Sequence, residues 1–163
     1  MSMKFRKIVY NIFKNSFVYT IVHSLRLRNV NRGKNFRLRQ KSFFDHPEKV
    51  YFGDDVFINR GCEFHVGGGN CCIKVGNNVQ FGMNVVCVCV SHELGSTNQR
   101  AGVDFYQSIF IGDGVWIGAN SLILPGVNIG KGSVIAAGSV VCENVDENVL
   151  VGGVPARIIK KLS

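Results

Sequence analysis

The chain has 163 residues, of which 46% are hydrophobic and 18% are charged, and this composition excludes an intrinsically disordered protein. It contains no run of 18 apolar residues of the kind that crosses a membrane as a helix. Nineteen glycines against three prolines indicate many turns at regular spacing rather than long helices.

Positive charge is concentrated at the start of the chain. Residues 1–41 hold 11 Lys and Arg and no acidic residue, whereas residues 42–163 hold 8 basic and 11 acidic residues and therefore carry a charge of −3. A basic segment of this kind binds nucleic acid, an anionic membrane surface or a phosphate-bearing substrate. Composition alone does not choose among the three.

An amphipathic helix is predicted for residues 1–27, where apolar residues recur at every fourth position. They are Phe5, Val9, Phe13, Phe17, Ile21 and Leu25. The helix either packs on the rest of the protein or lies on an anionic membrane. A nucleic-acid arm is the third reading, but no binding motif accompanies it, so we expect no nucleic-acid partner. We assign residues 1–45 to a basic N-terminal helical extension and residues 46–163 to the main domain.

Six cysteines are present without a C-x-x-C pair: Cys62, Cys71, Cys72, Cys87, Cys89 and Cys142. The N-terminal segment does not resemble a signal peptide, because Asn11, Lys14 and Asn15 interrupt its apolar run. We therefore predict reduced thiols that serve mainly as small apolar core residues, in a cytoplasmic protein.

A period of six residues dominates the C-terminal half. From Ile111 the chain reads IGDGVW, IGANSL, ILPGVN, IGKGSV, IAAGSV, VCENVD. The first residue of each hexapeptide is Ile or Val, and the fifth is small or β-branched. The same register occurs within residues 52–62 and 75–85. Such a repeat predicts a coil of very short strands, in which the first residue of each hexapeptide points inward. Three hexapeptides make one triangular turn, so the coil repeats every 18 residues and neighbouring turns must stack to close a core.

These motifs resemble the hexapeptide-repeat acetyltransferases, in particular the branch of galactoside, maltose and exopolysaccharide O-acetyltransferases. The resemblance covers about residues 50–161 and includes a terminal G-x-P-A-[KR] signature at residues 152–157. It implies an all-β fold, a left-handed parallel β-helix. Residues 91–109 break the period, and the resemblance makes them a protruding loop, which in a tight solenoid is usually functional.

Acetyl transfer to a hydroxyl requires a base that accepts the hydroxyl proton. The resemblance implies that this base is His92, which stands where the repeat opens into the loop. A neutral imidazole suits this role near neutral pH. We expect structural roles for His23, His46 and His65. Glu93 is interpreted as a solvated charge on the loop.

Acetyl-CoA is the co-substrate that the resemblance implies, and no metal is expected. The positions that match the family's cofactor-binding residues are Trp116, Ala119, Ala137, Cys142, Glu143, Arg157 and Lys160. Many relatives have Thr-Lys where this chain has Cys142-Glu143, which removes one cationic contact. Trp116 is expected to fill the core at a corner and also to line the site, with packing alone as the alternative.

Asn59 and Asn84 are the candidates for binding the acceptor, and both also fit the role of a turn asparagine. The resemblance implies an O-acetyltransferase acting on a sugar or polysaccharide precursor, assembled as a homotrimer. The basic N-terminal extension would make weak contact with the anionic inner face of the membrane. A sugar N-acetyltransferase and a non-catalytic β-helix scaffold remain as alternatives. A γ-type carbonic anhydrase needs three histidines around zinc, and the four histidines here include no closely spaced pair.

Overall fold

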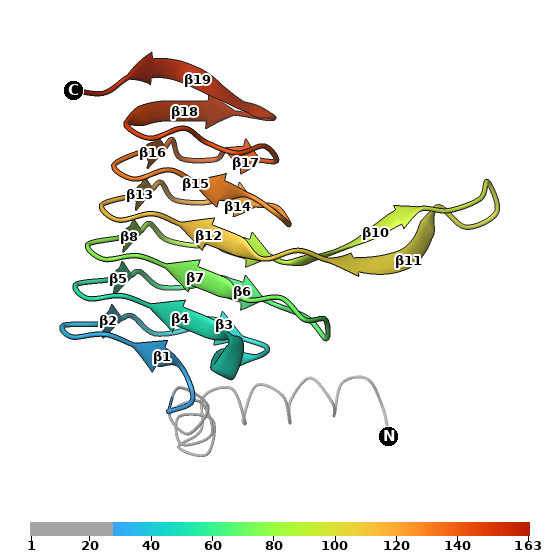
Figure 1. Ribbon diagram of the computed structural model, residues 1–163, viewed down its shortest axis with the longest axis horizontal. Helices are drawn as coiled ribbons and strands as arrows, with labels where there is room; N and C mark the ends of the chain where they lie inside the picture. The colour runs from blue at the N-terminus through green and yellow to red at the C-terminus, as the bar shows by residue number, and fades with distance from the viewer. Residues whose placement is uncertain (1–27) are drawn as a thin grey trace, which may run out of the picture. The chain divides into compact units, whose positions relative to one another are not determined.

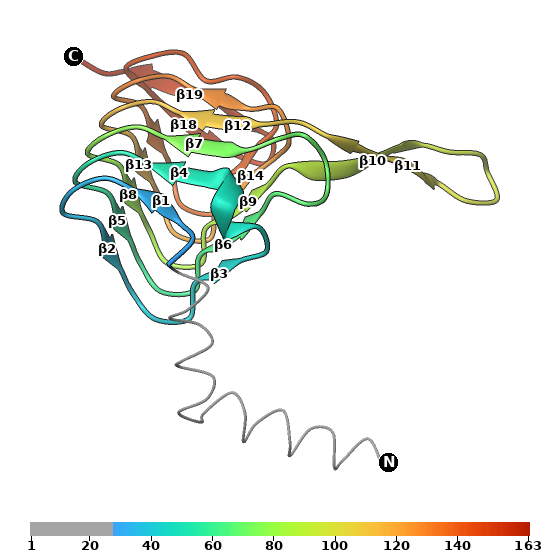
Figure 2. The ribbon, with the colours of Figure 1, turned by 60° about the horizontal axis from the view of Figure 1, so that its bottom comes forward.

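The structure is a computed structural model, and it describes residues 28–163. Short strands wind into a left-handed parallel β-helix of triangular cross-section (Figures 1 and 2). Within the described residues, the helical structure is a single 3₁₀ turn, η1 (Pro47–Lys49), and no helix is long and apolar enough to cross a membrane.

Three parallel sheets form the sides of the prism, each with one strand per coil. The first sheet contains β1 (Asn31–Arg32), β4 (Val50–Phe52), β7 (Ile73–Val75), β12 (Ile109–Ile111) and β15 (Asn128–Ile129). The second contains β2 (Arg37–Leu38), β5 (Phe57–Ile58), β8 (Gln80–Phe81), β13 (Trp116–Ile117), β16 (Val134–Ile135), β18 (Val149–Gly153) and the antiparallel β19 (Ala156–Lys161). The third contains β3 (Phe43–Phe44), β6 (Glu63–His65), β9 (Val86–Val88), β14 (Leu122–Ile123) and β17 (Val140–Val141).

The predicted 18-residue coil is confirmed by the strand register. Ile111 pairs with Ile129, Ile117 with Ile135, and Ile123 with Val141, each one coil further along the chain. The side chains of all six are buried, so the first residue of each hexapeptide faces the core as predicted. Each coil alone exposes its apolar edge, and stacking removes that surface from water.

The fifth residue of each hexapeptide is also buried, at the corners between sheets. Serine at this position satisfies its hydroxyl by bonding to the backbone of its own coil or the next one. Ser121 Oγ donates to Gly118 O at 2.9 Å and to Ala136 O at 3.1 Å, which joins two coils at one corner. A buried hydroxyl is tolerated here because it is hydrogen-bonded.

Aromatic rings fill the core of the first three coils. Phe44 and Phe64 stack at 4.8 Å between ring centroids, and Phe64 meets Phe52 and Phe81 edge-on at 5.5 Å. Offset and edge-on pairs are the favoured geometries for aromatic contacts. The core therefore changes from aromatic in the early coils to aliphatic in the later ones.

The first coil begins earlier than the boundary expected at residue 46, since β1, β2 and β3 already pair with β4, β5 and β6. The basic residues of this coil lie outside the core and hide the repeat in the sequence. The guanidinium groups of Arg37 and Arg39 lie over the Phe57 ring, at 5.0 and 5.9 Å from its centroid. The helix predicted for residues 1–27 lies outside the described residues.

Residues that break the period form a β-hairpin that projects from the prism (Figure 1). Its strands, β10 (Val90–Leu94) and β11 (Ala101–Tyr106), pair antiparallel with each other. Along the chain they lie between β9 and β12. A turn closes it, with Gln99 N donating to Ser96 O at 3.1 Å. Gly95 and the polar residues Ser96, Thr97 and Asn98 suit such a turn.

Candidate functional site

His92 lies on β10, directly opposite Asp104 on β11. Its Nδ1 atom is 2.9 Å from Asp104 Oδ1, and about half of each side chain is exposed, 51% and 48%. The carboxylate thus holds one ring nitrogen, while the other, Nε2, has no hydrogen-bond partner within residues 28–163. An imidazole whose Nδ1–H donates to a carboxylate presents Nε2 as the proton acceptor.

Asp104 is the site residue that sequence reasoning missed. Glu93, which follows His92 directly, is exposed, and the ion pair of His92 is made with Asp104 instead. Asp104 could have been found from its spacing, because it lies about as far after the turn residues 96–99 as His92 lies before them. A hairpin places such residues opposite each other.

Four of the predicted residues lie along one edge of the prism, the edge where the second sheet turns into the third: Asn59, Asn84, Ala119 and Ala137. Ala119 O accepts a hydrogen bond from Gly138 N at 2.8 Å, so Ala137 lies one coil beyond Ala119. Both side chains are small; Ala137 is exposed and Ala119 is half-buried.

The side chain of each of the two asparagines makes a hydrogen bond within the protein. Asn59 Oδ1 accepts from Arg60 N at 2.9 Å, whereas Asn84 Nδ2 donates to Asn120 Oδ1 at 3.1 Å. Asn84 also has a φ of 56°, in the left-handed region that asparagine tolerates. Both therefore serve as turn residues, and their acceptor-binding role remains a prediction.

Trp116 lies on the outer face of the second sheet, between Gln80 and Val134. Its side chain is 58% exposed, so it does not fill the core at a corner. The outward direction follows from the alternation of side chains along a strand, because Ile117 next to it is buried. Its role in lining a site remains a prediction.

The remaining predicted cofactor residues lie near the C-terminal end of the prism. Arg157 Nη1 is 3.3 Å from Glu143 Oε1, and both line a pocket of about 410 Å³ between β17 and β19. Lys160 lies on β19 opposite Leu150, and Cys142 is the exposed cysteine that precedes Glu143. The ion pair offsets part of the positive charge of Arg157.

Four of the other cysteines are buried, namely Cys62, Cys71, Cys87 and Cys89, whereas Cys72 is half-buried. Desolvation raises the pKa of Cys62 to about 11 and that of Cys89 to about 12, and it raises the pKa of Cys87 well above its usual value. These buried thiols are protonated near neutral pH and act as small apolar residues. Among the residues that the structure describes, no group of three His, Cys, Asp or Glu is placed to hold a metal ion.

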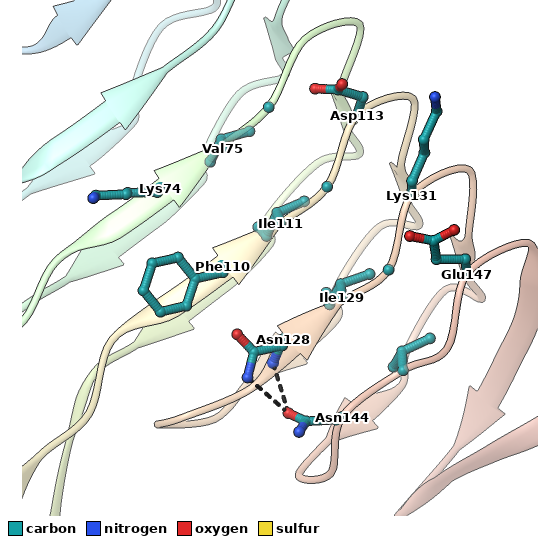
Figure 3. A pocket seen from close by; sticks show the side chains of 14 residues that line it. Lys74, Val75, Phe110, Ile111, Asp113, Asn128, Ile129, Lys131, Asn144 and Glu147 are labelled. Atoms are coloured by element: carbon teal, nitrogen blue, oxygen red, sulfur yellow. Dashed lines mark hydrogen bonds between the residues drawn. The ribbon is translucent and has the colours of Figure 1, made fainter.

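A shallow groove of about 570 Å³ crosses the outer face of the first sheet (Figure 3). Side chains from successive coils line it, including Lys74, Phe110 and Asn128. Asn144 Oδ1 accepts from Asn128 N at 2.9 Å and from its Nδ2 at 3.2 Å. The lining includes no histidine or cysteine, and none of the predicted catalytic, cofactor-binding or acceptor-binding residues belongs to it.

Residues 108–143 match the family model described as bacterial transferase hexapeptide (six repeats). A hexapeptide-repeat acetyltransferase of Vibrio cholerae, solved with acetyl coenzyme A, superposes with a TM-score of 0.79. It is 31% identical over 93% of this chain and 82% of its own. The chain belongs to the hexapeptide-repeat acetyltransferase family.

Two further relatives are named as O-acetyltransferases. A maltose O-acetyltransferase of Clostridium difficile 630 is 30% identical, with a TM-score of 0.77, and the match covers 98% of this chain and 86% of that one. A galactoside O-acetyltransferase of Lactococcus lactis is 34% identical over 71% of this chain. The chain spans only 55% to 64% of the length of the curated relatives from Lactococcus lactis, Escherichia coli, Saccharomyces cerevisiae and Schizosaccharomyces pombe.

Proposed function

We propose that this chain is an acetyl-CoA-dependent O-acetyltransferase that acts on a hydroxyl of a sugar or polysaccharide precursor. The observation that carries the proposal is the His92–Asp104 pair, with 2.9 Å between Nδ1 and Oδ1, on the hairpin that interrupts the repeat. Within an acetyltransferase family, an exposed and oriented imidazole at this place is suited to be the general base.

His92 Nε2 takes the proton of the acceptor hydroxyl as its oxygen attacks the thioester carbonyl carbon. The new C–O bond gives a tetrahedral intermediate, whose collapse breaks the C–S bond. The imidazolium then returns its proton to the departing thiolate. Asp104 holds the ring orientation and stabilises the imidazolium charge.

The co-substrate has a matching surface along the Ala119–Ala137 edge. Small side chains one coil apart allow the backbone there to bond an extended pantetheine arm, and the amide of Ala119 is our candidate donor to the oxyanion. The adenosine phosphates would lie near the basic end formed by Arg157 and Lys160. Since Glu143 already pairs with Arg157 at 3.3 Å, we assign Lys160 the larger share of phosphate attraction.

Assembly of a homotrimer is part of the proposal. His92 follows β9, while Ala119 precedes β14, so the two flank opposite edges of the third sheet in one chain. A base on one edge and a cofactor surface on the other are brought together when copies of the chain pack around a symmetry axis. Each site would then take its base and its cofactor surface from neighbouring chains.

The basic residues before position 42 suit an acceptor or surface of negative charge. We propose a cytoplasmic enzyme in weak peripheral contact with the inner face of the membrane, where lipid-linked precursors carry phosphates. Each Lys or Arg close to such a surface contributes about 1 kcal/mol, and salt screens the attraction.

A thiol-release assay with acetyl-CoA tests the function. The acceptor panel contains sugars, nucleotide sugars and amino sugars, because the amino sugars separate O-transfer from N-transfer. We expect thiol release with at least one hydroxyl acceptor, loss of the signal in His92→Ala, and an ester linkage in the product. Thiol release with amino sugars alone would replace O-transfer by N-transfer, and no release with any acceptor would contradict the proposal.

A further inference from the structure

Three side chains form a connected series along one face of the hairpin. Tyr106 Oη donates to Asp104 Oδ2 at 3.1 Å, while the other carboxylate oxygen, Oδ1, holds His92 Nδ1 at 2.9 Å. Asp104 and Tyr106 are two residues apart on β11, so they share a face of the strand. One carboxylate thus bridges the phenol and the imidazole.

The ring of Tyr106 rests on a turn of three glycines in the coil below, Gly67 to Gly69. A Cβ atom added at Gly69 would lie closer than 3.0 Å to three atoms of Tyr106, and one added at Gly67 would lie 2.9 Å from its ring. Gly67 has a φ of 74°, so the turn also uses a conformation that favours glycine. A side chain at Gly69 would displace the ring.

Two charged side chains anchor this turn to the prism. The carboxylate of Asp45 accepts from Val66 N at 2.9 Å and from Gly67 N at 3.0 Å. Lys49 Nζ donates to Gly69 O at 2.9 Å. These charge-assisted hydrogen bonds fix both ends of the surface on which Tyr106 lies.

A two-stranded hairpin that projects from a protein has little stability of its own. A catalytic side chain on such a hairpin must therefore be held by contacts that lead back to the folded body. Tyr106 makes such contacts, because its ring lies on the anchored glycine turn and its hydroxyl reaches the partner of His92.

We propose that Tyr106 is a positioning residue for His92, acting through Asp104, and that the Gly67–Gly69 turn is the platform that holds it. The inference rests on the proposed role of His92 as the base. The protonation state of the phenol agrees with it, since the hydrogen bond to Asp104 and the nearby negative charge raise the pKa of Tyr106. The phenol therefore remains a donor at neutral pH and above.

The alternative is that the ring of Tyr106 serves only to pack, in which case phenylalanine would replace it fully. Tyr106→Phe keeps the ring on the glycines and removes only the hydroxyl. We expect it to lower kcat about tenfold, the size of one hydrogen bond to a charged group, with unchanged KM and melting temperature. Tyr51→Phe, a change to an exposed tyrosine on the first sheet, is the matched control and should have no effect.

A double-mutant cycle tests whether Tyr106 affects kcat through Asp104. If Tyr106 acts through Asp104, Tyr106→Phe should cause no further loss of kcat in an Asp104→Asn background. The platform is tested with Gly69→Ala, which should lower kcat as Tyr106→Phe does. Gly68→Ala is its control, because the added Cβ would come no closer than 3.9 Å to Tyr106.

A spectroscopic measurement keeps this inference separate from the acetyl-transfer reaction. Long-range ¹H–¹⁵N NMR reports which ring nitrogen of His92 carries the proton, and we expect Nδ1–H in the wild type and a mixture of tautomers in Tyr106→Phe. If no acceptor is acetylated, the proposed function fails while this measurement still decides whether Tyr106 orients His92. An unchanged tautomer, or a kcat of Tyr106→Phe within twofold of the wild type, overturns the inference.

Discussion

Gly118 faces the backbone of Ala137 so closely that no side chain fits between them. A Cβ atom added at Gly118 would lie 2.5 Å from the amide nitrogen of Ala137 in the next coil. The separation between the coils is set by their backbone hydrogen bonds, among them Gly118 N to Ile135 O at 2.8 Å. The clash would therefore fall on backbone that cannot move without breaking the stack.

Gly118→Ala should consequently destabilise the protein by about 2–4 kcal/mol, as overpacking against backbone does. Gly138→Ala is the matched control at the same edge, since nothing lies within 4 Å of its added Cβ and only its φ of 72° opposes the change. That control should cost about 1 kcal/mol. Thermal unfolding of both variants measures the difference, and equal losses would contradict the argument from packing.

His92→Ala should keep the fold and lower kcat at least about a hundredfold, the usual contribution of a general base. The side chain is half exposed, so its removal opens no cavity in the core. His65→Ala is the control, because His65 pairs with Glu63 on β6 at 2.8 Å, outside the hairpin. Turnover of His92→Ala close to that of the wild type would rule out the assignment.

Cys142 should react first with iodoacetamide at pH 8. It is exposed, whereas Cys62 and Cys89 are buried and have pKa values raised to about 11 and about 12, which leaves little thiolate at that pH. If Cys142 borders the cofactor surface, acetyl-CoA should slow its alkylation without slowing that of the partly exposed Cys72. Peptide mass spectrometry measures both rates, and equal rates at Cys142 with and without acetyl-CoA would remove it from the cofactor surface.

Light scattering at micromolar concentration should give three times the mass of one chain. The reason is the placement of His92 and Ala119 at opposite edges of the third sheet, which leaves each chain with two half-sites. Mixing His92→Ala chains with chains that carry a disrupted cofactor edge, such as Gly118→Ala, should restore part of the activity. A monomeric mass in an active preparation would contradict the shared site.

The order of residues alone predicts the coil and its register. Ile117 and Ile135 are 18 residues apart, and each must face inward because a hexapeptide has only one apolar side to bury. The prediction of His92 as the base came from the resemblance of the surrounding motifs to the acetyltransferase family, and it stays a prediction. These features are periodic or local, so the order of residues carries them.

Other features of the site and of the first coil become visible only in the folded protein. Asp104 becomes the partner of His92 through the pairing of β10 with β11, and no period in the sequence predicts that pairing. The core constrains only the residues of the first coil that point inward. Outward residues such as Arg37 and Arg39 can therefore be basic, and the repeat is not recognisable in the sequence there. The expectation that Trp116 fills the core was wrong, because alternation along the strand turns it outward next to the inward Ile117. Contacts between coils depend on which residues stack, and stacking is a property of the folded prism rather than of any one hexapeptide.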